Sequence, residues 1–368
     1  MSDNFHSEKN FIFNFLQNPE ISNSYTKQQW SLLLRIARNA NILAHIGWLL
    51  KLKNIFDDAP SKVKDNINAA QTIVEYRKQT ALWELDRLHH ALNGIGTDII
   101  ALKGGAYLIA QLPFSEARMF ADIDILVKKE KIEMIEDMLL KQSWKSMKMD
   151  DYDQKYYREW SHEIPPLRHI ARTIEVDIHH TIIPPTSRLN PDPQKLLAET
   201  VASNENGFKT LSSYDMTLHS ATHLFYDSDL DNKLKDLIDL DQLITHFCKK
   251  ENDFVNKLIV RAGELDLQRP LFYTLYFTQK LLGTKITANE LKNSKKISGV
   301  SFPTVILMDI LVPLAILPEH PDFPRLTVRF ARWLLYIRSH YLRMPLKLLI
   351  PHLLYKSKTR WEASKSAA

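Results

Sequence analysis

The spacing of apolar residues changes twice along this chain, and this change constrains the fold more than any other feature. From Gln28 to Leu92 apolar residues recur every three or four positions, which predicts amphipathic helices. Short segments rich in isoleucine and valine follow, where apolar and polar residues alternate as they do in β-strands. These expected strands are 98–102, 121–127 and 172–182. After a proline-rich linker at 182–194, helical spacing is expected to return and to continue to the end.

This order predicts an α+β fold, in which a small mixed β-sheet core is flanked by helical regions on both sides. Asn93 and Gly94 are expected to end the last helix before the core, and residues 128–144 are expected to form an amphipathic helix within it. The expected regions are an N-terminal helical region at 1–93, an α/β core at 94–185 and a C-terminal helical region at 186–368.

Composition predicts an ordinary soluble protein of the reducing cytoplasm. The single cysteine, Cys248, excludes an internal disulfide and a zinc site built on several thiolates. The N-terminus lacks the basic start and apolar core of a secretory signal. The most apolar run, 302–318, is too short to span a membrane and contains Asp309 and Pro313, so we expect a buried helix. A net charge of +5 is too small by itself to indicate nucleic-acid binding.

Two adjacent glycines occupy the point where the first strand is expected to lead into a helix. The segment "ALKGGAYLIA" places Lys103, Gly104 and Gly105 between the strand at 98–102 and residues with helical spacing. Glycine accepts backbone angles that other residues resist, so a tight turn explains the pair. Backbone N–H groups at the start of a helix also bind anions, and Lys103 adds a positive charge. From this stretch alone, a turn and a phosphate site are both open interpretations.

Carboxylates are expected on one face of each of the next two strands. In "ADIDILV" Asp122 and Asp124 alternate with apolar residues, and in "TIEVDIHH" Glu175, Asp177 and His179 do the same. Acids this close repel one another unless a cation lies among them, and oxygen-rich clusters suit Mg²⁺ or Mn²⁺. Two such ions can promote phosphoryl transfer. For the Asp-Ile-Asp segment alone, the alternative is a solvated sheet face.

The order of these motifs resembles one known group of enzymes. The segments "LKGGAYL", "ARMFADIDILV" and "IEVDIHHTI" are similar to those of the uncharacterised bacterial nucleotidyltransferases of the DNA polymerase β-type superfamily. The resemblance covers about 85–185, and more loosely "LHSATHLF" and "LKDLIDLDQLI" after it. By this resemblance, the nucleotide-binding turn is Gly104 and Gly105, the metal-binding pair is Asp122 and Asp124, and the third acid is Asp177.

The chain departs from the wider superfamily in the turn, where a serine hydroxyl usually contacts a phosphate. Gly105 stands at that position, so only backbone donors are expected there. The interval from Gly105 to Asp122 is also long for the superfamily, although it suits this subfamily. Glu175 shares a face with Asp177, and we choose Asp177 as the ligand because an aspartate followed by Ile-His matches the subfamily better.

The resemblance implies an enzyme that transfers a nucleoside monophosphate from an NTP to a hydroxyl or amine and releases pyrophosphate. Asp122 and Asp124 would hold both metal ions, Asp177 would bind the catalytic ion, and Lys103 would help to hold the triphosphate. The sequence does not identify the acceptor. The alternative is a catalytically inactive or regulatory nucleotide-binding protein of the same fold, which the missing serine and the large helical additions favour.

Histidines offer a second candidate metal site. His219 and His223, at helical spacing, would bind zinc together with His179 or His180. The segment "HSATH" lacks the glutamate of a zinc-protease helix. We therefore favour a helix that packs on the α/β unit and holds His223 near the active face.

Two further charged residues lie near the motifs. Arg118 precedes the Asp-Ile-Asp segment and suits either a phosphate contact or a surface ion pair. Asp239 suits either a substrate contact or helix capping. The sequence leaves both choices open.

Basic and aromatic residues alternate near the C-terminus, and no acid lies between Phe323 and Trp361. Such a tail suits a weak, reversible contact with an anionic membrane surface or a polyanionic partner. The alternative is a terminal helix that buries Trp333, Leu334 and Tyr336 against the body. The basic residues of this tail are Arg325, Arg329, Arg332, Arg338, Arg343, Lys347, Lys356, Lys358 and Arg360.

Overall fold

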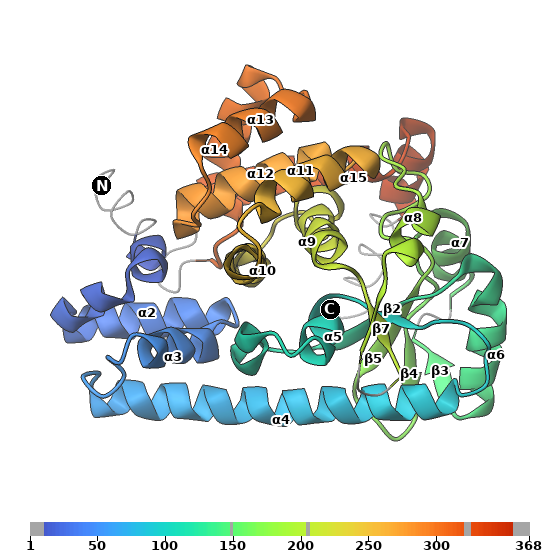
Figure 1. The fold of residues 1–368 in the computed structure, drawn as a ribbon, viewed down its shortest axis with the longest axis horizontal. Coiled ribbons are helices and arrows are strands. Elements are labelled where there is room, and N and C mark those ends of the chain that lie inside the picture. The colour runs from blue at the N-terminus through green and yellow to red at the C-terminus, as the bar shows by residue number, and fades with distance from the viewer. Residues whose placement is uncertain (1–10, 148–149, 204–206, 320–324, 356–368) are drawn as a thin grey trace, which may run out of the picture.

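The fold combines one β-sheet with helical regions on both sides of it in the chain, as the sequence predicts. We describe it from a computed structural model, which covers residues 11–147, 150–203, 207–319 and 325–355. The seven-stranded mixed sheet lies at one end of the molecule, and two layers of helices extend from it (Figure 1). The expected α+β class is therefore confirmed.

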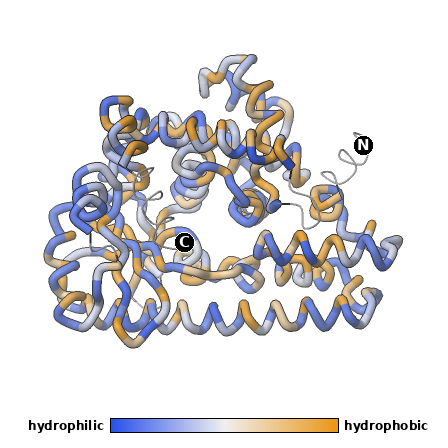
Figure 2. Tube along the Cα trace, turned by 180° about the vertical axis from the view of Figure 1, so that it is seen from behind, coloured by the Kyte–Doolittle hydropathy of each residue, from blue (hydrophilic) through white to orange (hydrophobic). Residues whose placement is uncertain are grey.

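The N-terminal helices form the first layer. They are η1 (Pro19–Ser24), α2 (Lys27–Asn39), α3 (Leu43–Leu52) and the long helix α4 (Ser61–Ala91). A capping box starts α2, because the Thr26 hydroxyl accepts from the backbone N–H of Gln29 and the Gln29 side chain accepts from that of Thr26. Asn41, at φ 57°, separates α2 from α3. Figure 2 shows hydrophilic and hydrophobic residues alternating along α4, which packs one side on the core.

The three predicted strands form the centre of the sheet. They are β1 (Ile100–Ala101), β2 (Asp122–Leu126) and β5 (Glu175–His179). β2 lies between its two neighbours, antiparallel to β1 and parallel to β5. The parallel register pairs Asp124 with Asp177 and Asp122 with Glu175. Acids of both strands are therefore brought side by side, as their alternation predicts.

Four strands lie outside the predicted ones. They are β3 (Trp144–Ser146), β4 (Leu167–His169), β6 (Val201–Ala202) and β7 (Lys209–Thr210), and the sheet order is β3-β4-β5-β2-β1-β7-β6. The expectation that helical spacing continues unbroken after 194 is wrong, because β7 pairs in parallel with β1 and β6 pairs with β7. These strands have two or three residues each, which is too short for an alternating pattern to be recognised.

Short helices connect the strands. They are α5 (Lys103–Ile109), η2 (Pro113–Ala117), η3 (Lys129–Lys131), α6 (Ile132–Lys141), α7 (Asp151–Trp160) and α8 (Pro193–Ala198). The predicted helix at 128–144 corresponds to η3 and α6, and its last residue enters β3. Before the sheet, α4 ends shortly before Asn93 as predicted, and Gly94 follows in a left-handed conformation with φ 83°.

The C-terminal helices form the second layer. They are α9 (Ser213–Thr222), the π-helical turn η4 (His223–Asp227), α10 (Leu234–Lys250), α11 (Phe254–Glu264), α12 (Gln268–Phe277), η5 (Thr278–Leu282), α13 (Ala288–Ser298), α14 (Phe302–Ala315) and α15 (Leu326–Arg343). The Ser212 hydroxyl accepts a hydrogen bond from the backbone N–H of Asp215 and so caps α9. In Figure 1 this layer lies opposite α4, with α5 between them.

Two apolar clusters hold the layers together. The first lies around the sheet and reaches Phe254 of α11 and Leu271 of α12. The second joins both ends of the chain, because Leu33 of α2 packs in the same cluster as Phe272 of α12 and Val312 of α14. The N-terminal and C-terminal helices therefore share a core. The division of the chain at 93 and 185 stays a prediction.

The apolar segment at 302–318 forms α14, which is only partly buried. Phe302 is 67% exposed and Ile310 is 58% exposed, whereas Met308 is buried in the second cluster. The expectation of a fully buried helix is wrong, because only one side of α14 packs on the body. Among the described residues, no single helix is long and apolar enough to cross a membrane. Taken together, α13 and α14 pass the same test of length and composition, but they bend by 112° at their junction.

Candidate active site

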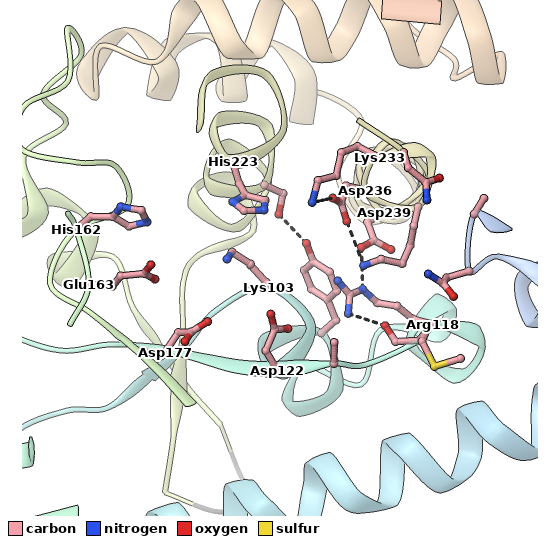
Figure 3. Close-up of a pocket in the computed structure, with 18 residues that line it drawn as sticks. Lys103, Arg118, Asp122, His162, Glu163, Asp177, His223, Lys233, Asp236 and Asp239 are labelled. Carbon is pink, nitrogen blue, oxygen red and sulfur yellow. Dashed lines mark hydrogen bonds and ion pairs between the residues drawn. The ribbon is translucent and has the colours of Figure 1, made fainter. Parts of the chain in front are cut away.

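A polar pocket of about 470 Å³ lies between the sheet and the second helical layer. Figure 3 shows His162, Glu163 and Asp177 at one end of the pocket, and Arg118, Lys233, Asp236 and Asp239 at the other. Lys103, Asp122 and His223 lie between these two ends. The remaining lining residues are Ala40, Asn41, Tyr107, Met119, Ala121, Ser220, Asn232 and Lys235. Four of the predicted site residues are therefore at one pocket, namely Lys103, Arg118, Asp122 and Asp177.

The predicted third acid and its alternative differ in position. Asp177 lines the pocket. Glu175, two residues earlier on β5, has a side chain that is 41% exposed and forms an ion pair of 3.7 Å with Arg168 of β4. It is not among the residues that line the pocket. The register of β5 thus places one of the two acids at the candidate site.

Asp124 lies behind the pocket rather than at its surface. Its carboxylate is only 2% exposed. Its Oδ1 atom lies 2.7 Å from Lys103 Nζ and 3.1 Å from His179 Nε2. Burial favours the neutral form of Asp124, but the charges and hydrogen bonds of Lys103 and His179 outweigh it and hold its pKa well below the usual range. Asp124 is therefore an ionised carboxylate that anchors Lys103.

Asp177 has an unsatisfied carboxylate oxygen. Among the described residues, its buried Oδ1 atom has no hydrogen-bond partner. Burial raises the pKa of Asp177 well above its usual range, and the nearby carboxylates of Asp124, Glu163 and Asp122 raise it further. Lys103 opposes this rise only in part. The site thus contains more negative charge than its own side chains neutralise.

The first residue of α5 has an unusual backbone conformation. Lys103 has a left-handed conformation with φ 43°, which residues other than glycine rarely adopt. Gly104 and Gly105 follow as buried residues of α5 and do not line the pocket. A Cβ atom on Gly104 would lie 2.4 Å from Nη1 of Arg118, whereas one on Gly105 would meet only Ala101 and Leu85 at 3.9 and 4.0 Å. A side chain at 105 would therefore face the core, and the role of this turn in binding phosphate stays a prediction.

Arg118 is held in a buried ion pair rather than the surface pair that the sequence left open. Its Nε atom lies 2.7 Å from Oδ2 of Asp239, and the two side chains are 10% and 7% exposed. Its guanidinium also lies over the rings of Tyr107 and Phe120, at 5.4 and 5.3 Å from their centres. Asp239 lies inside α10, so it does not cap that helix. Both residues line the pocket.

The start of α10 contributes charged residues that were not predicted for the site. Lys233 and Lys235 line the pocket together with Asp236. Lys235 Nζ lies 3.1 Å from Asp236 Oδ1, and Lys233 Nζ lies 3.7 Å from Asp236 Oδ2. Burial favours neutral Asp236, but these lysines outweigh it and lower its pKa far below the usual value. Two lysines share one carboxylate here, which leaves positive charge at this end of the pocket.

The predicted packing of the histidine helix agrees with the structure. α9 packs against α5, and His223 at the start of η4 lines the pocket. Burial lowers the pKa of His219 to about 3 and that of His223 well below its usual value, so both rings are neutral. His180 lines a different pocket, with Lys128.

A different group of residues has the spacing of metal ligands. Among the described residues, His162, Glu163 and His179 offer ligand atoms that all lie within 4.8 Å of one another. The sequence analysis placed His179 on the acidic face but missed His162 and Glu163. The only sequence signal for them is a His-Glu pair before two prolines, which predicts no position in the fold.

Comparison with known proteins identifies a family. A model of the family described as "uncharacterised nucleotidyltransferase" matches residues 26–283. The chain belongs to this family. No curated protein and no solved structure matches it. The matched residues include both walls of the candidate site and end before α13, so nucleotidyl transfer is the general activity that the family indicates.

Proposed function

We propose that this nucleotidyltransferase transfers a nucleoside monophosphate from an NTP to a hydroxyl or amine acceptor in the pocket, and that it is a member of the DNA polymerase β-type superfamily. The observation that carries the proposal is the juxtaposition of acids and cations in one pocket. Asp122 and Asp177 come from neighbouring parallel strands. The cations come from three other places, namely the start of α5 for Lys103, the segment before β2 for Arg118 and the residue before α10 for Lys233. The acids can bind metal ions and the cations can bind phosphates. Together they suit an NTP, which carries one reacting phosphate and further phosphates.

The acids fit Mg²⁺ or Mn²⁺, since they offer the oxygen ligands that these ions prefer. In the part of the chain that the structure describes, Asp177 Oδ1 is buried without a hydrogen-bond partner, and Asp122 lines the same pocket. Asp122 and Asp177 would hold the ion. Asp124 would become a further ligand if Lys103 no longer formed an ion pair with it. When bound, the ion supplies Lewis acidity to the reacting phosphate.

The protein's own residues have separate tasks in this proposal. Lys103 moves from Asp124 to the phosphates of the NTP, and Arg118 and Lys233 hold the far end of the triphosphate. Asp177 lines the pocket and helps to remove the proton of the acceptor hydroxyl or amine. Before the NTP binds, the ionised carboxylate of Asp124 keeps the Lys103 ammonium charged and close to the pocket.

Exchange of single acids tests this proposal. The purified protein is incubated with labelled NTP, Mg²⁺ or Mn²⁺ and a small-molecule extract as the source of acceptor, and transfer of label is measured. Asp122→Asn and Asp177→Asn should each lower transfer roughly 10²-fold or more. The matched control is Glu175→Gln, on the same strand but outside the pocket, which should keep full activity. Equal transfer by Asp177→Asn and the wild type would contradict the proposal.

One observation favours the alternative of a catalytically inactive or regulatory nucleotide-binding protein. Asp124, expected to bind metal, is engaged by Lys103 and His179 instead. Calorimetry with a non-hydrolysable NTP separates the two proposals. If NTP binds without any dependence on Mg²⁺ and no label is transferred, the protein is a binding module, whereas metal-dependent binding supports the enzyme.

A further inference from the structure

The end of the pocket away from most of its cations contains a second group of potential ligands. His162 and Glu163 lie in the loop after α7, and His179 is the last residue of β5. Glu163 forms an isolated antiparallel bridge with His179. The backbone N–H of His180 donates to the carbonyl of His162 at 2.9 Å, and that of Ile164 donates to the carbonyl of Ile178 at 3.1 Å. The loop is therefore fixed to β5 on both sides of the three side chains.

The side chains converge at distances that suit ligands of one ion. His179 Nε2 lies 3.4 Å from Glu163 Oε2 and 3.1 Å from Asp124 Oδ1. Ligands that bind one ion through bonds of about 2.1 Å are separated by roughly 3.0–3.4 Å. A ligand atom of His162 lies within 4.8 Å of those of Glu163 and His179, so all three side chains offer a ligand atom to the same space.

Two observations point to a cation among these side chains. His162 is 92% buried, and among the described residues its Nδ1 atom has no hydrogen-bond partner. The carboxylates of Asp124, Glu163 and Asp177 lie close to one another and to the ammonium of Lys103, so negative charge is concentrated at this end of the pocket. A buried polar atom without a partner and a concentration of negative charge together indicate a cation.

We infer that His162, Glu163 and His179 bind one divalent transition metal ion, of which Zn²⁺ is the best match. Two imidazoles and one carboxylate are the ligands of many catalytic zinc sites, which keep a further position open. Imidazole also disfavours Mg²⁺, which prefers oxygen ligands. Its ligands differ from Asp122 and Asp177, which lie in the same pocket, and the inference does not depend on nucleotidyl transfer. His162 and Glu163 line the pocket, so an ion that they bind would lie beside a substrate at that end of the pocket.

Cobalt provides a direct probe, since Co²⁺ bound by histidine absorbs visible light and competes with Zn²⁺. The full chain is stripped with a chelator and titrated with Co²⁺, and then with Zn²⁺, while absorption and metal content are measured. We expect one tightly bound Co²⁺ per chain, displaced by Zn²⁺ and not by an excess of Mg²⁺. His162→Gln and Glu163→Gln should each weaken Co²⁺ binding at least tenfold, in line with the loss of a ligand.

The matched control is His180→Gln, which removes the neighbouring histidine that lines another pocket and should leave Co²⁺ binding unchanged. Circular dichroism checks that each variant is folded; if His162→Gln is not, Glu163→Gln carries the test. Absent Co²⁺ binding in the folded wild type, or equal affinity in folded Glu163→Gln, would overturn the inference. Asp122→Asn separates the two proposals, because it should keep Co²⁺ binding while it loses label transfer.

Discussion

Two neighbouring glycines at the start of α5 have different reasons to be glycine. A Cβ atom on Gly104 would overlap Nη1 of Arg118 at 2.4 Å and crowd Cδ1 of Phe120 at 3.1 Å. Arg118 cannot simply move aside, because it is buried and paired with Asp239. A Cβ atom on Gly105 meets only ordinary contacts. Gly104 therefore leaves room for the arginine of the pocket.

This difference predicts opposite effects of the same substitution. Gly104→Ala should destabilise the protein by about 1–3 kcal/mol, as overpacking of a filled site does, and should weaken NTP binding because the Arg118–Asp239 ion pair is displaced. Gly105→Ala should leave stability unchanged or raise it by up to about 1 kcal/mol, since alanine favours a helix over glycine. Urea unfolding and calorimetry measure both quantities. If the two variants have the same stability and the same affinity for NTP, the glycines matter only for the backbone conformation of the turn.

At the scale of single residues, the sequence identified much of the candidate site but not its arrangement. The alternation of polar and apolar residues places Asp122 and Asp177 on the polar faces of β2 and β5. Because these two strands are neighbours that pair in parallel, both acids come to one region. The burial of Asp124 beneath Lys103 was not predictable, because it depends on the helical layer above. His162, Glu163 and Lys233 reach the pocket only through long-range packing.

At the scale of elements, α15 presents an apolar stripe to solvent. Ala331 and Leu335 on its opposite face are buried, and α15 packs against α14. The alternative in which Trp333, Leu334 and Tyr336 are buried is wrong for Trp333, whereas Leu334 and Tyr336 are partly buried. The exposed fractions along the stripe are 82% for Leu326, 58% for Phe330, 55% for Trp333, 42% for Ile337 and 41% for Tyr341. Arg332 and Arg338 instead contact Asp231 and the carbonyl of Phe225. Lys356, Lys358 and Arg360 lie outside the described residues.

This stripe predicts weak, salt-dependent binding to anionic lipid. The described part of α15 and the helix Leu346–Tyr355 contain no acid, Arg329 beside the stripe is 63% exposed, and Lys347 is exposed. Each cation near an anionic surface contributes about 1 kcal/mol, so phosphatidylserine vesicles should sediment the protein at low salt and release it at high salt. Phosphatidylcholine vesicles should not bind it.

Paired serine substitutions test which surface is responsible. Phe330→Ser with Trp333→Ser should abolish sedimentation with phosphatidylserine. The control pair, Ile73→Ser with Trp83→Ser, removes two side chains of α4 that are each 52% exposed, and it should leave sedimentation intact. Equal loss in both pairs would mean that binding is not specific to α15.

The elements themselves were predictable where they are long or strongly alternating. α4 and α9 follow from helical spacing and caps, and β2 follows from alternation. β6 and β7 were not predicted, because a strand of two residues is too short to show alternation of polar and apolar side chains. α14 was expected to be buried because its sequence is strongly apolar yet too short to span a membrane, but only one of its sides packs on the body.

At the scale of the whole molecule, buried histidines set the response to acid. Burial lowers the pKa of His45, in the N-terminal layer, to about 4, and the same holds for His340 of α15. Others with lowered pKa are His162, His180, His219 and His223. An unfolded chain binds a proton on each histidine below about pH 6.5, whereas the native state does so only near its own lower pKa.

Stability should therefore fall as the pH decreases from about 6.5 towards 4, because the unfolded state gains more protons than the native state in this range. For His45 alone, a decrease of the pKa from 6.5 to about 4 corresponds to at most roughly 3 kcal/mol. His45→Gln removes the titrating imidazole. The free energy of unfolding of this variant should therefore change less between pH 7 and pH 5 than that of the wild type. Urea unfolding at several pH values measures the slope. His45→Gln with His340→Gln should flatten it further, because the two helices titrate independently. A slope unchanged by both substitutions would mean that these rings already reach solvent in the native state.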